Sequence, residues 1–141
     1  MKLILPLFFC VAPLVFTSCG DSFPESSKVE ESADIGIVDV DAEKAAELVA
    51  SNGDLVILDV RTPEEFADGH LAGAVNIDFN GTDFEEKVSE LDTSKSYLVH
   101  CRSGGRSGAS LPVFEGLGFS EVYHLNTGYL GWTEAGKPIE K

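Results

Sequence analysis

A cysteine in a glycine-rich turn that also holds two arginines is the stretch of this chain best suited to chemistry. Cys101 follows the apolar run 97–99 and His100, and the turn after it contains Arg102, Ser103, Gly104, Gly105, Arg106 and Ser107. Small residues let the backbone curl so that successive N–H groups point inward, and a helix that begins beyond the turn adds its positive end. Because such a setting stabilises an anion, we expect Cys101 to rest as a nucleophilic thiolate.

A plainer interpretation of the same residues stays open as the alternative. A cysteine after a buried strand commonly serves as a small apolar side chain, and a Gly-Gly pair commonly marks a turn and nothing more. The two glycines and two arginines that follow Cys101 so closely favour the catalytic interpretation.

The composition fits one globular domain. The chain has 141 residues, of which 43% are hydrophobic, enough for one core but not for two domains. It has 24 Asp and Glu against 10 Lys and Arg, a formal net charge of -14. Because so acidic a surface repels nucleic acid and anionic lipid headgroups, we expect neither as a partner.

Residues 1–18 have the pattern of an export signal. Lys2 gives a short positive start, residues 3–16 are nearly all apolar, and small residues lead up to Cys19. An apolar run this short is typical of a signal peptide rather than of a membrane span. The pattern resembles a bacterial lipoprotein signal, in which cleavage leaves a lipidated cysteine, here Cys19, as the first residue. The alternative is an ordinary secretory signal in which Cys19 has no role.

The lipoprotein interpretation predicts both the location and the state of the thiols. The protein would be exported, anchored to a membrane through the lipid on Cys19, and would face the periplasm or the cell exterior. Residues 19–34, rich in Ser, Glu and Asp, would form a flexible tether. Cys10 would be lost with the signal, so Cys101 would be the remaining free thiol and no intramolecular disulfide is expected, in spite of an oxidising compartment.

Residues 35–141 alternate between strand and helix patterns. We expect strands over residues 35–40, 55–58, 74–77, 97–100 and 122–125, and helices over residues 42–51, 63–68, 83–91, 107–117 and 127–135. Pro112 inside the fourth helix should remove a hydrogen bond or bend the helix. The alternation predicts an α/β fold with a mostly parallel central sheet of about five strands and helices on both faces. In such sheets ligands bind at the carboxyl ends of the strands, where Cys101, Asp59 and Arg61 are placed.

Several motifs of this region are similar to those of single-domain rhodanese-like sulfurtransferases. They are Leu58 to Arg61, Glu64 to Phe66, Gly69 to Asn76, Cys101 to Ser107, and Gly118 with Phe119. The resemblance covers residues 35–141 and implies the three-layer rhodanese fold. It also implies an enzyme whose cysteine accepts a sulfane sulfur from a thiosulfate-like donor, becomes a persulfide, and passes the sulfur to cyanide or to a thiol.

The length of the cysteine loop separates this chemistry from that of related enzymes. Four residues stand between Cys101 and Arg106, as in the sulfurtransferase loop of the family, whereas the related phosphatases have a loop one residue longer that accommodates a phosphate. Phosphatase or arsenate-reducing chemistry is therefore the weaker alternative. A module that binds a persulfide or another anion without turnover is a further alternative, because a fold does not settle a function.

The resemblance implies roles for the residues around the cysteine. The N–H groups of residues 102–106 would hold the thiolate or persulfide. Arg102 would face the mouth of the site and attract anionic donors, and Arg106 would point back into the fold toward a carboxylate. Asp59 and Arg61 would brace the loop; the alternative is a buried ion pair with no part in turnover.

The three histidines are not expected to act as catalysts or metal ligands. His70 should anchor a turn by hydrogen bonding, His100 should direct its side chain away from that of Cys101, and His124 lies in a strand pattern. No group of Cys and His has the spacing of a metal site, so we expect neither a metal nor a cofactor. The expected partners are the small sulfur donor and acceptor, and the expected state is a monomer.

Overall fold

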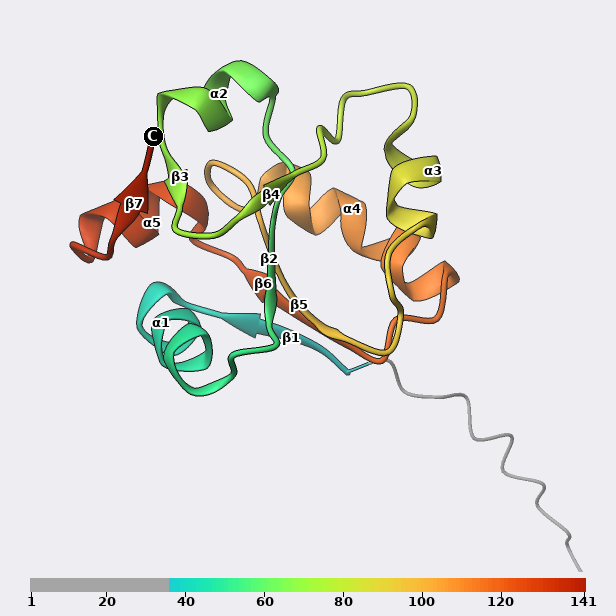
Figure 1. Ribbon diagram of the computed structural model, residues 1–141, viewed down its shortest axis with the longest axis horizontal. Helices are drawn as coiled ribbons and strands as arrows, with labels where there is room; N and C mark the ends of the chain where they lie inside the picture. Colours follow the sequence, from blue (N-terminus) through green and yellow to red (C-terminus); the bar gives the residue numbers. More distant parts are fainter. Residues whose placement is uncertain (1–35) are drawn as a thin grey trace, which may run out of the picture. The chain divides into compact units, whose positions relative to one another are not determined.

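The computed structural model of this chain describes residues 36–141 (Figure 1). The predicted signal peptide over residues 1–18, the lipidation site Cys19 and the tether over residues 19–34 lie outside the described residues, so they stay predictions. Within residues 36–141, no helix is both long enough and apolar enough to cross a membrane.

Five strands form the central sheet, and every neighbouring pair in it is parallel. Their order across the sheet is β1 (Gly36–Val40), β6 (Glu121–Leu125), β5 (Ser96–His100), β2 (Val56–Asp59) and β4 (Val75–Asn76). The predicted α/β fold with a parallel five-stranded sheet is therefore confirmed. All five strands end at the same edge, and Figure 1 shows the turn between β5 and α4 at that edge.

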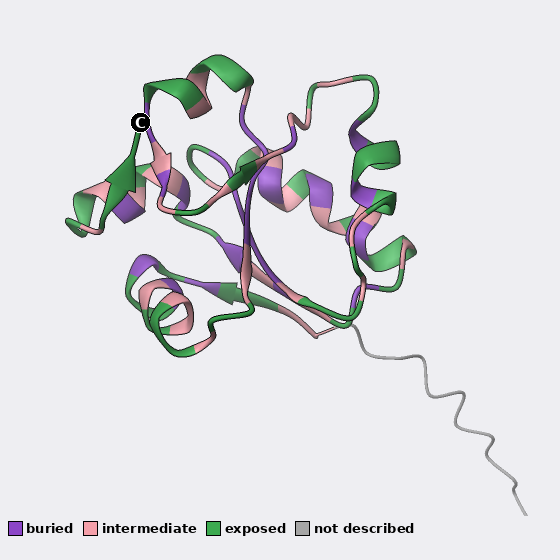
Figure 2. Cartoon of the chain, viewed as in Figure 1, coloured by how far each residue is buried: buried purple, intermediate pink, exposed green. Residues whose placement is uncertain are grey.

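Helices cover both faces of the sheet. Helices α1 (Ala42–Ser51) and α5 (Gly128–Glu134) lie on one side, and α3 (Phe84–Ser89) and α4 (Gly105–Gly116) lie on the other, while α2 (Pro63–Asp68) stands above β2 (Figure 1). The buried residues divide accordingly into two clusters, one beneath each helical layer. Burial on both faces explains why the central strands are continuous apolar runs, which Figure 2 shows as buried over β2 and β5.

The helices begin where the sequence places capping residues. The Asp41 side chain accepts a hydrogen bond from the Lys44 N–H at 2.8 Å at the start of α1. At the start of α2, Thr62 and Glu65 form a capping box, in which each side chain binds the backbone N–H of the other residue. The capping box fixes the position of Glu65, which becomes important in the candidate site.

One feature of the fold differs from the sequence prediction. A second sheet pairs β3 (His70–Leu71) with β7 (Ile139–Glu140) antiparallel, and two-residue strands are too short to show an alternating pattern in sequence. Helix α4 contains Pro112, as predicted, and runs on to Gly116 although proline has no N–H to donate.

Candidate active site

The sulfur of Cys101 lies in a ring of hydrogen-bond donors between β5 and α4. Cys101 follows the last residue of β5 and is 1% exposed. Its Sγ accepts a hydrogen bond from the Gly104 N–H at 3.2 Å and from the Ser107 hydroxyl at 3.4 Å. The backbone N–H groups of Ser103 and Ser107 also favour the ionised sulfur and lower the pKa of the thiol. Of the N–H groups of residues 102–106, to which the sequence prediction assigned this role, that of Gly104 forms a hydrogen bond to the sulfur.

These donors change the acidity of the thiol. Burial opposes ionisation of Cys101, because a charged sulfur loses its hydration. The hydrogen bonds from the Ser107 hydroxyl and from the amides of Ser103, Gly104 and Ser107 outweigh that effect and hold the pKa of the Cys101 thiol below its ordinary value. A lowered pKa increases the thiolate fraction at neutral pH, and the thiolate is the nucleophilic form.

The two glycines of the loop are not equivalent. Gly104 has a φ of +93°, and a Cβ atom on it would lie 2.1 Å from the carbonyl oxygen of Asn126. Gly104 therefore has to be glycine for two reasons: other residues rarely adopt its backbone conformation, and there is no room for a Cβ atom. Gly105 begins α4, and a Cβ atom there would have no heavy atom within 4 Å. The structure accordingly has no steric need for glycine at position 105.

Backbone N–H groups of helix α5 bind the carbonyl groups of the cysteine loop. The N–H of Tyr129 donates to the Cys101 carbonyl at 2.8 Å, and the N–H of Leu130 donates to the Arg102 carbonyl at 3.0 Å. Gly128 permits this approach: its φ is +62°, and a Cβ atom on it would lie 2.5 Å from the Arg102 carbonyl oxygen. These bonds hold both carbonyl groups on α5, which leaves the N–H side of the loop for the sulfur.

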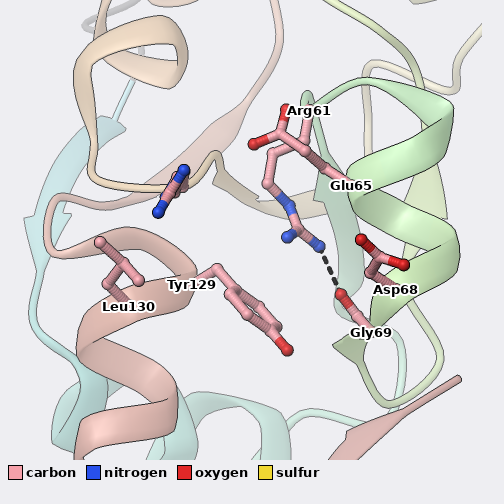
Figure 3. A pocket seen from close by; sticks show the side chains of 7 residues that line it. Arg61, Glu65, Asp68, Gly69, Tyr129 and Leu130 are labelled. Carbon is pink, nitrogen blue, oxygen red and sulfur yellow. Dashed lines mark hydrogen bonds between the residues drawn. The ribbon is translucent and has the colours of Figure 1, made fainter.

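Asp59 and Arg61 form a buried ion pair at the end of β2. The exposed fractions are 0% for Asp59 and 3% for Arg61. The Arg61 guanidinium donates to Asp59 Oδ2 at 2.6 Å and to the Gly69 carbonyl at 2.7 Å, and it lies 4.2 Å from the centre of the Tyr129 ring. Figure 3 shows the Arg61 side chain beside Tyr129 and its bond to Gly69. Tyr129, whose N–H binds the Cys101 carbonyl, thus connects the ion pair with the cysteine loop.

His100 adds a second support to the same carbonyl group. Its Nδ1 lies 3.1 Å from the Cys101 carbonyl oxygen, and since a carbonyl only accepts, Nδ1 carries the hydrogen. Its Nε2 lies 3.7 Å from Asp59 Oδ2 and has no hydrogen-bond partner among residues 36–141. Burial lowers the pKa of His100, which keeps the ring neutral. The neutral ring of His100 therefore donates from Nδ1 to the Cys101 carbonyl, and Nε2, which carries no hydrogen, stays buried without a hydrogen-bond partner among residues 36–141.

Arg106 points away from the sulfur and closes the loop against α2. Its guanidinium forms a bidentate pair with the Glu65 carboxylate, with N–O distances of 2.6 and 2.9 Å. The hydrogen bond from Arg106 lowers the pKa of Glu65 to about 2, and the same bond raises the pKa of Arg106. The sequence prediction expected a carboxylate partner for Arg106 without naming it, because Glu65 is 41 residues away along the chain.

Arg102, the residue after Cys101, lines a cavity beside the cysteine loop that we call the mouth of the site; Cys101 itself is not among the lining residues. Arg102 is exposed and shares this cavity of about 270 Å³ with Arg61, Glu65, Asp68, Gly69, Tyr129 and Leu130 (Figure 3). Arg61 and Glu65 are committed to their own ion partners, whereas Arg102 forms no ion pair within residues 36–141. Its charge is therefore available to an anion that enters the cavity. Sequence reasoning missed Asp68, Tyr129 and Leu130, because no motif marks the wall of a cavity.

His70 and His124 take different positions relative to the loop. His70 stacks on Phe66 with ring centres 3.8 Å apart, and its Nδ1 lies 3.0 Å from the Phe66 carbonyl oxygen, so it holds the turn after α2. His124, for which sequence reasoning named no role, lies with Nε2 2.9 Å from Ser107 Oγ. Its position in an apparent core strand concealed that contact.

The arrangement is suited to a nucleophilic sulfur that carries negative charge. It offers amide and hydroxyl donors around Sγ, the positive end of a twelve-residue helix that begins at Gly105, and an exposed guanidinium at the mouth. Within residues 36–141, no three His, Cys, Asp or Glu side chains form a group that could hold a metal ion.

Comparison with known proteins agrees with this geometry. The family model for the rhodanese-like domain matches residues 41–135. Thiosulfate sulfurtransferase 16 of Arabidopsis thaliana is 38% identical over 93 residues, which are 59% of this chain and 78% of the relative. Thiosulfate sulfurtransferase GlpE of Ectopseudomonas mendocina is 33% identical over 87 residues, 62% of this chain and 77% of the relative. The crystal structure of a rhodanese-related protein from Thermoplasma volcanium is 30% identical with a TM-score of 0.64, covering 73% of this chain and 97% of that one.

Proposed function

Because the chain belongs to the family of rhodanese-like domains, we propose that it is a sulfurtransferase that carries a sulfane sulfur as a persulfide on Cys101. The observation that carries the proposal is the pair of hydrogen bonds that Cys101 Sγ accepts from the Gly104 amide and the Ser107 hydroxyl, at the start of helix α4. Two relatives named as thiosulfate sulfurtransferases support thiosulfate as the donor to be tested first.

The reaction proceeds in two displacements at sulfur. The Cys101 thiolate attacks the outer sulfur of thiosulfate, a sulfur–sulfur bond forms to Cys101, and the bond inside thiosulfate breaks so that sulfite leaves with the electron pair. The product is a persulfide anion on Cys101. Cyanide then attacks the terminal sulfur, and thiocyanate leaves while the electron pair of the broken bond restores the thiolate. No proton transfer or external oxidant is needed in either step.

The chain's residues stabilise each charged species in turn. Exposed Arg102 attracts the dianionic donor to the cavity. The Ser103, Gly104 and Ser107 amides hold the thiolate before the first step and the persulfide after it. Since Arg106 is committed to Glu65, it keeps the loop in shape and does not contact the donor. A donor set fixed before the reaction begins costs no rearrangement during it.

Loading of the purified protein tests this proposal. Incubation with thiosulfate is expected to add the mass of one sulfur atom to the peptide that contains Cys101, and later addition of cyanide should remove it and yield thiocyanate. Cys101→Ser is the matched variant and should neither gain the sulfur nor produce thiocyanate. An intact, folded protein whose Cys101 peptide keeps its mass throughout would refute the proposal.

A second function, binding or sensing of a persulfide or another anion without turnover, is the alternative to be tested. The donors around the sulfur of Cys101 would hold an anion with or without turnover. Turnover with excess donor and acceptor separates the two functions. A sensor would accept at most one sulfur atom per molecule, whereas an enzyme would release many equivalents of thiocyanate.

We also propose that the protein is an exported lipoprotein that works as a monomer. Support comes from the apolar run over residues 3–16 followed by small residues up to Cys19. Expression in a bacterium with an alkyne-tagged fatty acid should label the wild-type chain and leave Cys19→Ala unlabelled. Equal labelling of both would overturn the lipid assignment, and sedimentation of the detergent-solubilised protein as a dimer would overturn the monomer.

A further inference from the structure

A buried histidine that the proposed reaction does not use lies directly behind the cysteine loop. His124 is in β6, is 6% exposed, and packs against the backbone of α4 at Gly108. Its Nε2 lies 2.9 Å from Ser107 Oγ, and its Nδ1 lies 2.7 Å from Asp39 Oδ1 on the neighbouring strand β1. Ser107 Oγ in turn lies 3.4 Å from Cys101 Sγ. A continuous chain of hydrogen-bonding groups therefore connects a carboxylate with the sulfur.

The Ser107 hydroxyl has one hydrogen and several neighbours that can accept it. They are Cys101 Sγ, the Gly104 carbonyl oxygen at 3.2 Å, and His124 Nε2 whenever that nitrogen carries no hydrogen. A bare Nε2 accepts the hydroxyl hydrogen at 2.9 Å and so draws it away from the sulfur. A protonated Nε2 donates to the hydroxyl oxygen, or to the Gly104 carbonyl oxygen 3.2 Å away, and leaves the hydroxyl hydrogen free for the sulfur.

Asp39 determines which protonation states of the ring are available. Because an ionised carboxylate only accepts hydrogen bonds, the hydrogen of His124 faces Asp39 from Nδ1. With Nδ1 protonated, Nε2 carries a hydrogen only when the ring is an imidazolium. Within residues 36–141, the titratable groups bonded to this ring are Asp39 from β1, directly, and Cys101 after β5, through Ser107 of α4. The charge of His124 thus sets the direction of the Ser107 hydroxyl.

We propose that His124, held by Asp39, is a positioning residue that turns the Ser107 hydroxyl toward Cys101 when its ring is protonated and away from Cys101 when its ring is neutral. The thiolate then accepts a hydrogen bond from the Ser107 hydroxyl that depends on pH, and hydrogen bonds from backbone amides that do not. By thermodynamic reciprocity, an anionic sulfur favours the imidazolium to the same degree. Its relevance to turnover rests on the proposed function, because a persulfide anion would gain the same donor, but the thiol alone suffices for the test.

The rate at which iodoacetamide alkylates Cys101, measured on the full chain over a range of pH, gives the test. The rate is read from the mass of the Cys101 peptide after digestion, so Cys10 and Cys19 do not contribute. Ultraviolet absorbance of the thiolate, measured as the difference from Cys101→Ser, reads the same ionisation without a reagent that has to reach the buried sulfur. The variants are His124→Gln, which has an amide but no titratable ring, and Ser107→Ala, which removes the hydroxyl; His70→Gln is the matched histidine control.

We expect the wild-type curve to depart from the single ionisation of a thiol, because the Ser107 hydroxyl donates to the sulfur in one charge state of His124 and not in the other. In both His124→Gln and Ser107→Ala the curve should reduce to that single ionisation, and His70→Gln should keep the wild-type shape. The Cys101 thiol should differ in acidity on the order of tenfold between the two charge states of His124, the size of one hydrogen bond to a charged group. If His124 only supports the fold, His124→Gln will scale the wild-type curve by a constant factor without changing its shape, and that result would overturn the proposal.

Asp39→Asn keeps the test decisive if the His124 variant does not fold. The Asp39 side chain is 66% exposed, so the fold tolerates its replacement. Loss of the carboxylate removes the acceptor that holds the hydrogen on Nδ1, and the shape of the curve should therefore change, while an unchanged curve would contradict the proposal. The alkylation result does not depend on sulfur transfer. A protein that fails to load sulfur but shows the wild-type departure from a single ionisation would refute the proposed function and leave this inference in place.

Discussion

Replacement of Gly104 by alanine is predicted to disable the sulfur site, whereas the same change at Gly105 is predicted to leave it intact. The Cβ atom introduced by Gly104→Ala would lie 2.1 Å from the Asn126 carbonyl oxygen, although Cβ atoms essentially never approach within 3.0 Å of such a neighbour. The loop therefore has to move by about 1 Å. The Asn126 backbone cannot easily give way, because its N–H donates to the Val40 carbonyl at 3.1 Å.

Two penalties follow from that displacement. The φ of +93° at Gly104 costs alanine about 1–2 kcal/mol, even before the overlap is counted. A displacement of about 1 Å in a catalytic group can reduce a rate on the order of 100-fold. The amide of Gly104 is itself a donor to Cys101 Sγ, so the displacement acts directly on the sulfur.

The matched variant Gly105→Ala shows whether the effect belongs to position 104 or follows from replacing any glycine of the loop. Position 105 has no heavy atom within 4 Å of an added Cβ and opens α4, so Gly105→Ala should raise stability by about 0.4–1 kcal/mol and keep the loading rate. Thermal unfolding and the rate of sulfur loading from thiosulfate measure both effects. If Gly104→Ala loads at the wild-type rate, or if Gly105→Ala is equally slow, the role assigned to the donor ring is wrong.

Three further predictions concern the charged residues of the site. Arg102→Ala should raise KM for thiosulfate and change kcat little in steady-state assays, because Arg102 attracts the donor at the mouth; an unchanged KM would contradict that role. The pKa of Glu65, lowered from 4.5 to about 2, contributes stability that is present above pH 4.5 and lost as pH falls toward 2, on the order of 1–3 kcal/mol once solvent screening of this half-buried pair is included. Thermal unfolding of Glu65→Gln should therefore lack this pH dependence, and a curve parallel to wild type would refute the contribution. Asp59→Asn leaves Arg61 buried and unpaired, which should cost about 3–5 kcal/mol in chemical denaturation; a much smaller loss would show that the pair is dispensable.

The order of strands and helices could be predicted from the sequence because local patterns encode it. Continuous apolar runs marked β2 and β5, Thr62 and Glu65 marked the start of α2, and the alternation of elements implied parallel strands. Cys101, Asp59 and Arg61 follow strands that the sheet places side by side, so their neighbourhood was also predictable. The pairing of β3 with β7 was not, because two-residue strands carry no periodic signal.

Contacts between side chains distant in sequence could not be predicted. Glu65 reads locally as a capping residue, and its second role, as partner of Arg106, appears only once α2 stands over the loop. His124 and Asp39 read as strand residues, and their connection to Ser107 depends on the register of β1 with β6. Gly104 and Gly105 look alike in the sequence. The structure distinguishes them, because a Cβ atom would clash at position 104 and meet no heavy atom within 4 Å at position 105.

The proposed function requires that Cys101 carry sulfur from donor to acceptor in turnover. Thiosulfate with an isotopic label in its outer sulfur, followed by cyanide, follows that transfer atom by atom. We predict that the label appears first on the Cys101 peptide and then in thiocyanate, at a rate that matches steady-state turnover. Thiocyanate that forms at the same rate with Cys101→Ser, or a label that stays on Cys101 while thiocyanate accumulates, would contradict it.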